Sequence, residues 1–129
     1  MDPATNRVVA EIPIEAHSQY GGAEKVAVGE GAVWVLGEGR LFKVDPTTND
    51  VVDMVAVGDW SSHLAVYGGG VWAMVGAGEI RLSRVDPSTM QIVASEDIGP
   101  IPKIAPGALA AGGGYVWFSS GDGLARVEP

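Results

Sequence analysis

One segment occurs three times along this chain and restricts its fold more than any other feature. The three copies read DPATNRVVAEI, DPTTNDVVDMV and DPSTMQIVASE, and they begin at Asp2, Asp45 and Asp86. A second segment repeats independently of the first as VAVGEGAVW, LAVYGGGVW and LAAGGGYVW, and its copies end at Trp34, Trp72 and Trp117. The period of about 42 residues is typical of repeat architectures. We therefore interpret residues 1–129 as a single domain of three units, approximately 2–44, 45–85 and 86–129.

The periodicity within each unit is that of β-strands. Val, Ile and Trp alternate in short runs, and Gly, Pro, Asp and Asn separate these runs. The best-preserved unit predicts four strands, over residues 25–28, 32–36, 40–44 and 50–57. No helical period extends beyond a single turn, so the pattern predicts an all-β fold.

The segments between the predicted strands have the composition of tight turns. Gly29-Glu30-Gly31 and its two counterparts supply positive φ angles for hairpins. In the Asp-Pro turns, proline presets φ and the aspartate carboxylate accepts backbone N–H groups. We assign this structural role to Asp45, Pro46, Asp86 and Pro87. A phosphate-binding loop would need a helix after the glycines, but β-branched residues follow them instead.

Units of 40 to 45 residues with four antiparallel strands are the blades of β-propellers. The sequence therefore predicts three four-stranded antiparallel blades, which is half of a six-bladed propeller. Three tryptophans recur at one position of the unit, so we interpret Trp34, Trp72 and Trp117 as repeat core residues.

The units also resemble a known family of repeats. A Gly-rich turn before VW, followed by VDP, Thr, Asn and VV, resembles the YVTN-type propeller repeats of surface-layer and YncE-like proteins, to which streptogramin lyase is related. The resemblance covers essentially the whole chain. It implies the propeller fold, but such propellers include sensor domains, binding scaffolds and a few enzymes, so it does not select a function.

A propeller closes only when its blades form a ring, typically of 4 to 8 blades, and three blades are too few. Two copies would give six blades related by a two-fold axis, which is the commonest symmetry of soluble oligomers. By the repeat alignment, residues 7–14 correspond to an orphan outer strand, and residues 124–127 to the third strand of a blade. We therefore expect an obligate homodimer with strand exchange at the termini, from a natural half-propeller gene or an engineered fragment.

Composition excludes several other classes of partner and site. The chain carries sixteen acidic against eight basic residues, a formal net charge of −8, which opposes binding to nucleic acid or to anionic lipid. Its apolar runs fall far short of the roughly 18 residues that a membrane helix needs. There are no cysteines, so disulfides and thiolate metal sites are excluded. We expect no secretory signal in this chain, which leaves the compartment open.

Residues that depart from the repeat are the candidates for ligand binding. In a propeller, the connectors between blades lie on one face around the central channel, where propellers usually bind small molecules or proteins. The candidates in these connectors are His17, Tyr20, Glu24, Trp60, Ser62, His63 and Lys103.

Catalysis is not the function that the sequence favours. The resemblance to streptogramin lyase implies a magnesium ion and a histidine base, and the groups of these types here are His17, His63 and Glu24. One histidine and one glutamate in different blades make a weak constellation for catalysis, and no serine lies in a G-x-S-x-G turn. We therefore predict no catalytic residue, metal or cofactor. The expected function is a self-assembling scaffold, and the alternative is a sensor module that binds a ligand or protein on the propeller top face.

Overall fold

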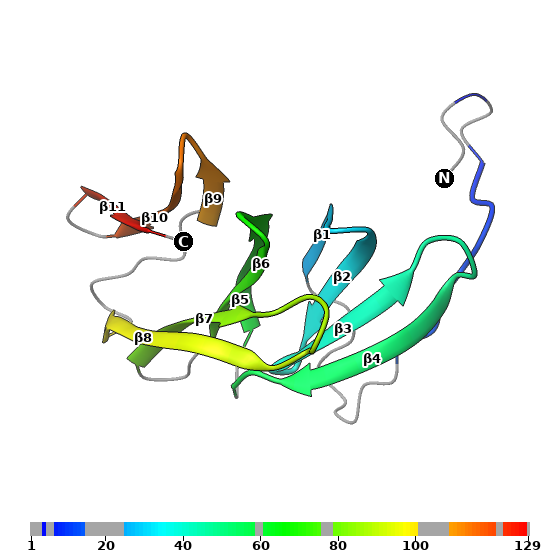
Figure 1. Ribbon diagram of the computed structural model, residues 1–129, viewed down its shortest axis with the longest axis horizontal. Coiled ribbons are helices and arrows are strands. Elements are labelled where there is room, and N and C mark those ends of the chain that lie inside the picture. The colour runs from blue at the N-terminus through cyan, green and yellow to red at the C-terminus, as the bar shows by residue number, and fades with distance from the viewer. Residues whose placement is uncertain are drawn as a thin grey trace.

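In the computed structural model, the described residues are 4, 7–14, 25–58, 61–75, 79–100, 109–120 and 123–128. All regular secondary structure in these ranges is β-strand, which confirms the all-β prediction. The strands form three antiparallel sheets with four, four and three members (Figure 1).

The strands follow one another through each sheet as a simple meander, so neighbours in sequence are neighbours in space. The first sheet contains β1 (Lys25–Gly29), β2 (Ala32–Gly37), β3 (Arg40–Asp45) and β4 (Asp50–Ala56). The second contains β5 (Ser61–Tyr67), β6 (Gly70–Val75), β7 (Glu79–Val85) and β8 (Ile92–Pro100). The third contains β9 (Leu109–Gly112), β10 (Tyr115–Ser120) and β11 (Gly123–Val127). Each strand of the first sheet begins and ends within one residue of its predicted bounds. The third sheet has three of the four expected strands in the described part of the chain.

The hairpins that join the first two strands of each sheet use positive φ angles. Glu30 and Gly31 have φ angles of 51° and 73° between β1 and β2. Gly113 and Gly114 have φ angles of 62° and 87° at the matching place between β9 and β10. Residues with a Cβ rarely adopt this conformation, which explains the glycines at positions 31, 113 and 114, whereas Glu30 adopts it with a side chain.

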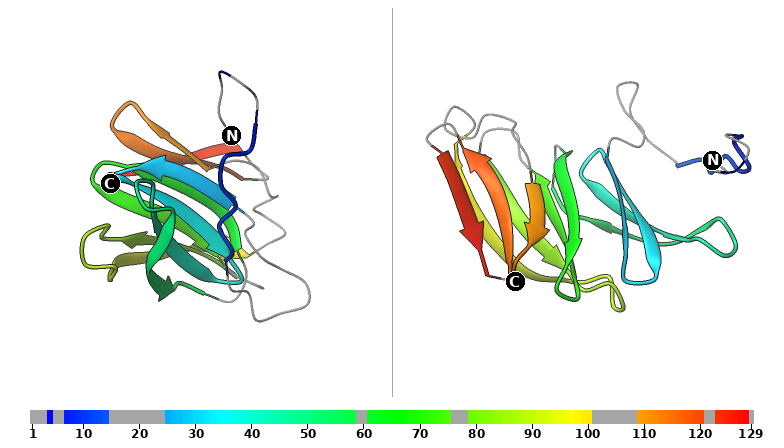
Figure 2. Two further views of the ribbon diagram at one scale, coloured as in Figure 1. Left: turned by 90° about the vertical axis from the view of Figure 1, so that its right-hand side faces the viewer. Right: turned by 90° about the horizontal axis from the view of Figure 1, so that it is seen from above.

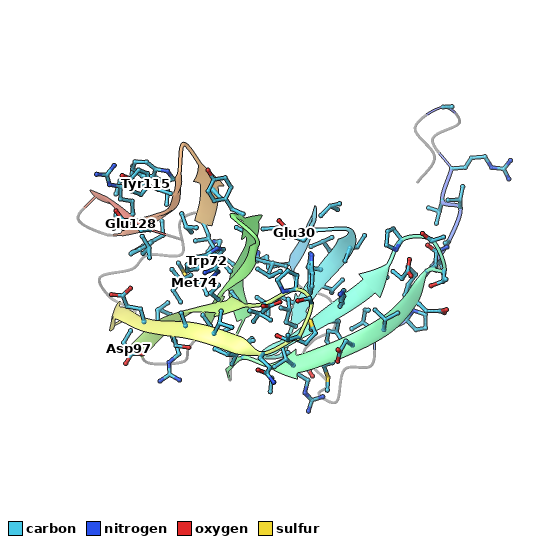
Figure 3. All side chains as sticks on the ribbon, viewed as in Figure 1. Glu30, Trp72, Met74, Asp97, Tyr115 and Glu128 are labelled. Atoms are coloured by element: carbon cyan, nitrogen blue, oxygen red, sulfur yellow. The ribbon has the colours of Figure 1, made fainter. Side chains whose placement is uncertain are left out.

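The three sheets stack face to face, with the second sheet between the other two (Figure 2). Successive side chains of a strand point to opposite faces, so β6 contributes to both interfaces. Val71, Ala73 and Val75 pack with the first sheet. Trp72 and Met74 pack with the third sheet (Figure 3). The second sheet is consequently covered on both faces, and all six residues of β6 are buried.

The sheets approach one another most closely along their first strands, β1, β5 and β9. A Cβ atom built at Gly29 would lie 2.7 Å from a methyl carbon of Val66 on β5. The Tyr67 hydroxyl in turn accepts a hydrogen bond of 2.8 Å from the Gly114 backbone N–H of the third sheet. These contacts set the spacing of consecutive sheets at one edge of the stack.

We predict that Gly29→Ala destabilises the chain by about 1–3 kcal/mol, because the β-branched Val66 side chain has little rotamer freedom with which to avoid the added methyl group. Urea unfolding would measure the change. The double variant Gly29→Ala with Val66→Ala removes the clash, so its cost should be less than the sum of the two single costs. Additive costs would show that the two residues are not in contact.

Candidate assembly surfaces

The three repeated tryptophans lie at equivalent positions of β2, β6 and β10, and Trp34 and Trp72 each point toward the following sheet. Trp34 and Trp72 are buried between sheets. Trp117 points away from the second sheet and is only partly buried. The indole Nε1 of Trp34 donates to the Gly29 carbonyl at 2.9 Å, and Trp117 donates to Gly112 at 3.0 Å. The tryptophan position is therefore built alike in the first and third sheets but is covered only in the first.

Each tryptophan is paired with a basic side chain on the next strand. Lys43 lies over Trp34 at 5.6 Å from the ring centroid, and Arg84 lies over Trp72 at 5.8 Å. On the third sheet, the Arg126 guanidinium lies 5.7 Å from the Trp117 centroid. Each pair is directly cross-strand, and its geometry is that of a cation–π contact. The pairing is thus a repeated feature of the unit.

The outward face of the third sheet carries apolar side chains whose counterparts are buried. Leu124 on β11 is 68% exposed, whereas Leu41 and Leu82, at the same position of the first and second sheets, are 0% and 1% exposed. Tyr115 lies edge-on to Trp117 on this face, with the ring centroids 5.8 Å apart. We call the face formed by Tyr115, Trp117, Leu124 and Arg126 the third-sheet face.

The outward face of the first sheet is apolar as well. Val26 and Val28 on β1 are 63% and 74% exposed. Their counterparts, Leu64 and Val66 on β5, are partly buried against the neighbouring sheet. We call this the first-sheet face, and it comprises Val26, Val28, Val33, Val35, Phe42 and Val44.

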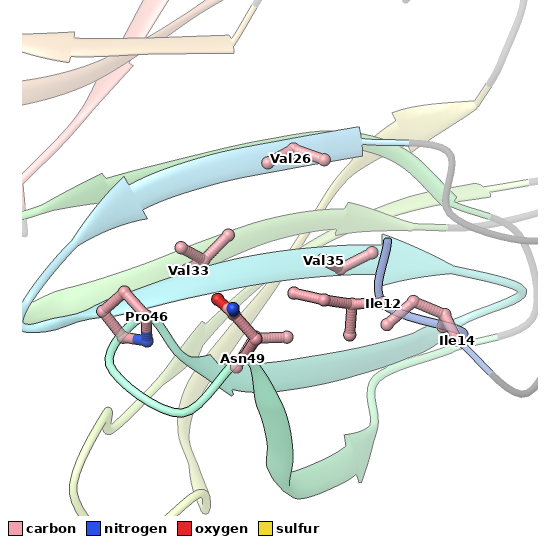
Figure 4. Close-up of a pocket in the computed structure, with 8 residues that line it drawn as sticks. Ile12, Ile14, Val26, Val33, Val35, Pro46 and Asn49 are labelled. Atoms are coloured by element: carbon pink, nitrogen blue, oxygen red, sulfur yellow. The ribbon is translucent and has the colours of Figure 1, made fainter. Parts of the chain in front are cut away.

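A groove of about 310 Å³ opens on the first-sheet face (Figure 4). Its floor is formed by Val33, Val35 and Val44, and the Asp45 turn contributes Pro46 and Asn49 to its rim. The lining is mostly hydrocarbon, so water in this groove is displaced favourably by an apolar occupant.

Residues 12–14 already cover part of this face. Ile12 and Ile14 pack against the buried cluster of Val35, Phe42 and Val44. Residues 8–14 form no strand, and Arg7 forms an isolated bridge. The repeat alignment assigns Ile12 and Ile14 to the positions of Val55 and Val57. Those two valines pack between the first and second sheets. The two isoleucines take the equivalent position on the opposite, outward face of the first sheet.

The two Asp-Pro turns share two internal hydrogen bonds, and Asp86 Oδ1 also accepts the Ser88 hydroxyl and the Thr89 N–H. Asp45 Oδ1 accepts the Thr47 backbone N–H at 2.7 Å, and Asp86 Oδ1 accepts the Ser88 N–H at 2.8 Å. Asn49 and Met90 close the turns with φ angles of 60° and 57°, and each donates its N–H to the carbonyl of the turn aspartate. Pro46 and Pro87 are the second residues of these turns, so their carbonyl groups occupy equivalent positions in the two turns.

Of the seven ligand-binding candidates from the sequence, only Ser62 and His63 lie within the described residues. His17, Tyr20, Glu24, Trp60 and Lys103 lie outside the described ranges. Ser62 and His63 belong to β5, which begins at Ser61, so their expected placement in a connector is wrong. The register of β5 on β6 shifts between Ser61 and His63, which leaves Ser62 at a bulge. The bulge lets β5 begin at Ser61, before the alternation of apolar residues starts. The sequence pattern did not indicate this bulge.

No group of three or more histidine and acidic side chains that could hold a metal ion occurs among the residues described. No helix in that part of the chain could cross a membrane. Comparisons with protein-family models and with curated proteins found no match. The open sheet faces are consequently the features of this structure that point most directly to a function.

The Asp86 turn predicts a pH dependence of stability. Hydrogen bonds from the Ser88 hydroxyl, and then from the backbone N–H groups of Ser88 and Thr89, lower the pKa of Asp86. A carboxyl group with a lowered folded-state pKa stabilises the fold above its ordinary pKa, and this contribution is lost as the pH falls through the folded-state pKa. Between about pH 5 and pH 1, the melting temperature of Asp86→Asn should therefore fall less than that of the wild type. Ser88→Ala should show an intermediate slope, and identical slopes in all three proteins would contradict the assignment.

Proposed function

We propose that this chain is a non-catalytic, self-assembling scaffold, and that two copies close a six-bladed β-propeller about a two-fold axis. The blades are the three sheets of each copy. The third-sheet face of one copy covers the first-sheet face of the other, and the two-fold axis makes this contact twice. The resemblance of the repeat to YVTN-type propellers supports the same blade geometry.

One observation carries the proposal, namely the exposure of Leu124. The same repeat position is buried in the first and second sheets because a following sheet covers it there. The third sheet lacks such a cover among the described residues, and its leucine is 68% exposed. Soluble proteins seldom leave large contiguous apolar faces open, so an exposed face of this kind marks an interaction surface.

The occupant that fits each open face is the opposite face of a second copy. The contact between the first and second sheets is the internal template, since Trp34 and Leu36 of one sheet pack with Val71 and Val85 of the next. Trp117 stands at the position of Trp34. The groove on the first-sheet face is lined by Val33 and Val44, which stand at the positions of Val71 and Val85. Closure therefore repeats an arrangement that the chain already makes internally.

The segment 7–14 completes the third sheet of the other copy as its fourth strand. The edge of β11 is unpaired among the described residues, and unpaired edges bind further strands readily. The register follows from the sheets within the chain, where Phe42 lies opposite Met54 and Ser83 lies opposite Ser95.

The same register places Ala125 opposite Glu11 of the second copy. Within one copy these two residues belong to opposite ends of the stack, because β11 and the N-terminal segment lie on opposite sides of the molecule (Figures 1 and 2). Contact between them therefore reports on assembly.

Cysteine pairs test this arrangement directly, since the chain contains no cysteine of its own. Residues directly opposite in antiparallel strands have Cα atoms about 4.5–5.5 Å apart, within the range of a disulfide. The double variant Glu11→Cys with Ala125→Cys should form a covalent dimer under mild oxidation, detected by non-reducing electrophoresis and mass spectrometry.

The matched control is Ala10→Cys with Ala125→Cys. A slip of one residue turns a side chain to the other face of the sheet, so this pair should cross-link poorly. Equal cross-linking of both pairs, or no covalent dimer from the Glu11 pair, would contradict the proposed exchange.

A further inference from the structure

We infer that Arg126 binds across the interface, with its guanidinium donating to the backbone carbonyl of Pro46 in a second copy. This inference rests on the proposed ring. In it, the Arg126 side chain determines how the third-sheet face of one copy is aligned on the first-sheet face of the other. The bond would occur twice in the dimer.

The template is a bond between the first and second sheets. The Lys43 ammonium lies over Trp34 and donates to the Pro87 carbonyl at 2.7 Å. This bond leaves one sheet and ends on the Asp-Pro turn of the next. It thus links a cation–π pair to the following unit, 44 residues further along the chain.

Arg126 stands at the position of Lys43. It lies opposite Trp117 on β10, just as Lys43 lies opposite Trp34 on β2. The distances from the cation to the ring centroid are 5.7 Å and 5.6 Å. Arg126 is exposed on the third-sheet face, and the Tyr115 ring also lies under its guanidinium, at 4.1 Å. The two rings hold the charge in place before a partner arrives, which lowers the entropy lost on binding.

Pro46 is the counterpart of Pro87 on the face that remains open. Both prolines follow an aspartate that accepts a backbone N–H of its own turn through Oδ1, and both turns end in a residue with a positive φ angle. Pro46 also lines the groove of the first-sheet face, next to Val33 and Val44 (Figure 4). When Trp117 of one copy packs over those valines as Trp34 packs over Val71, Arg126 is directed toward the Pro46 carbonyl.

Apolar packing alone would leave the register less well defined. The open faces consist mainly of Val, Leu and aromatic side chains, which interact without strong directionality. A charged donor bonded to a carbonyl adds direction and contributes more than a neutral hydrogen bond. Arg126 is the basic residue that the structure places on the third-sheet face.

The test compares three variants of the full chain. Arg126→Met keeps an unbranched stem of similar size but removes the charge and the donors. Arg126→Lys keeps a donor of the kind that Lys43 already uses. Arg81→Met is the matched control, since Arg81 lies on β7 in an exposed pair with Asp97, at 3.1 Å, and exposed pairs contribute little. Sedimentation equilibrium over a dilution series measures the dimer dissociation constant, and the urea midpoint at fixed protein concentration is a second readout.

We expect Arg126→Met to raise the dissociation constant on the order of 100-fold, because two charge-assisted bonds are lost and each accounts for about tenfold. Arg126→Lys should stay within about tenfold of the wild type, and Arg81→Met should be unchanged. A wild-type dimer that Arg126→Met does not weaken would overturn this inference and leave the ring intact. Equal weakening by Met and Lys would also overturn it. A monomeric wild type would refute the ring itself.

Discussion

Each sheet of this protein has two apolar faces, and the need to cover both of them governs the rest of the structure. The second sheet meets this requirement within the chain, since one face of β6 packs with the first sheet and the other with the third. Among the described residues, the outward face of the third sheet is exposed at Leu124, and the outward face of the first sheet is covered only in part, by Ile12 and Ile14. Burial of apolar surface is the main favourable term in folding and in association, so the same requirement that builds the stack predicts a partner for its ends.

A small set of repeated residues forms the contacts between consecutive sheets. A tryptophan fills the space between sheets, a basic residue lies over it, and a capped Asp-Pro turn offers a carbonyl to the previous unit. The tryptophan and its basic partner recur in all three sheets, and the capped Asp-Pro turn recurs at Asp45 and Asp86 among the described residues. The exposed face of the third sheet therefore repeats side-chain positions that are buried between the sheets of the chain itself.

The sequence predicted the strands well where glycine and Asp-Pro turns separate them, as in the first sheet, because these residues fix local backbone angles. It did not locate Ser62 and His63 correctly, since a bulge extends β5 ahead of the apolar alternation. The bond from Lys43 to Pro87 was also not predictable, because it joins residues that only the stacking of sheets brings together. The exposure of Leu124 and Val28 was not predictable from the sequence either, because equivalent positions of the repeat are buried in other sheets.

The absolute mass of the protein in solution tests the central claim most directly. Light scattering coupled to size-exclusion chromatography would measure it without assumptions about shape. The chain mass is 13.3 kDa, and a closed ring of two copies predicts a single species at twice that mass over a wide range of concentrations. A stable, folded monomer at every concentration would contradict the account, because its open faces would then persist in water without a partner.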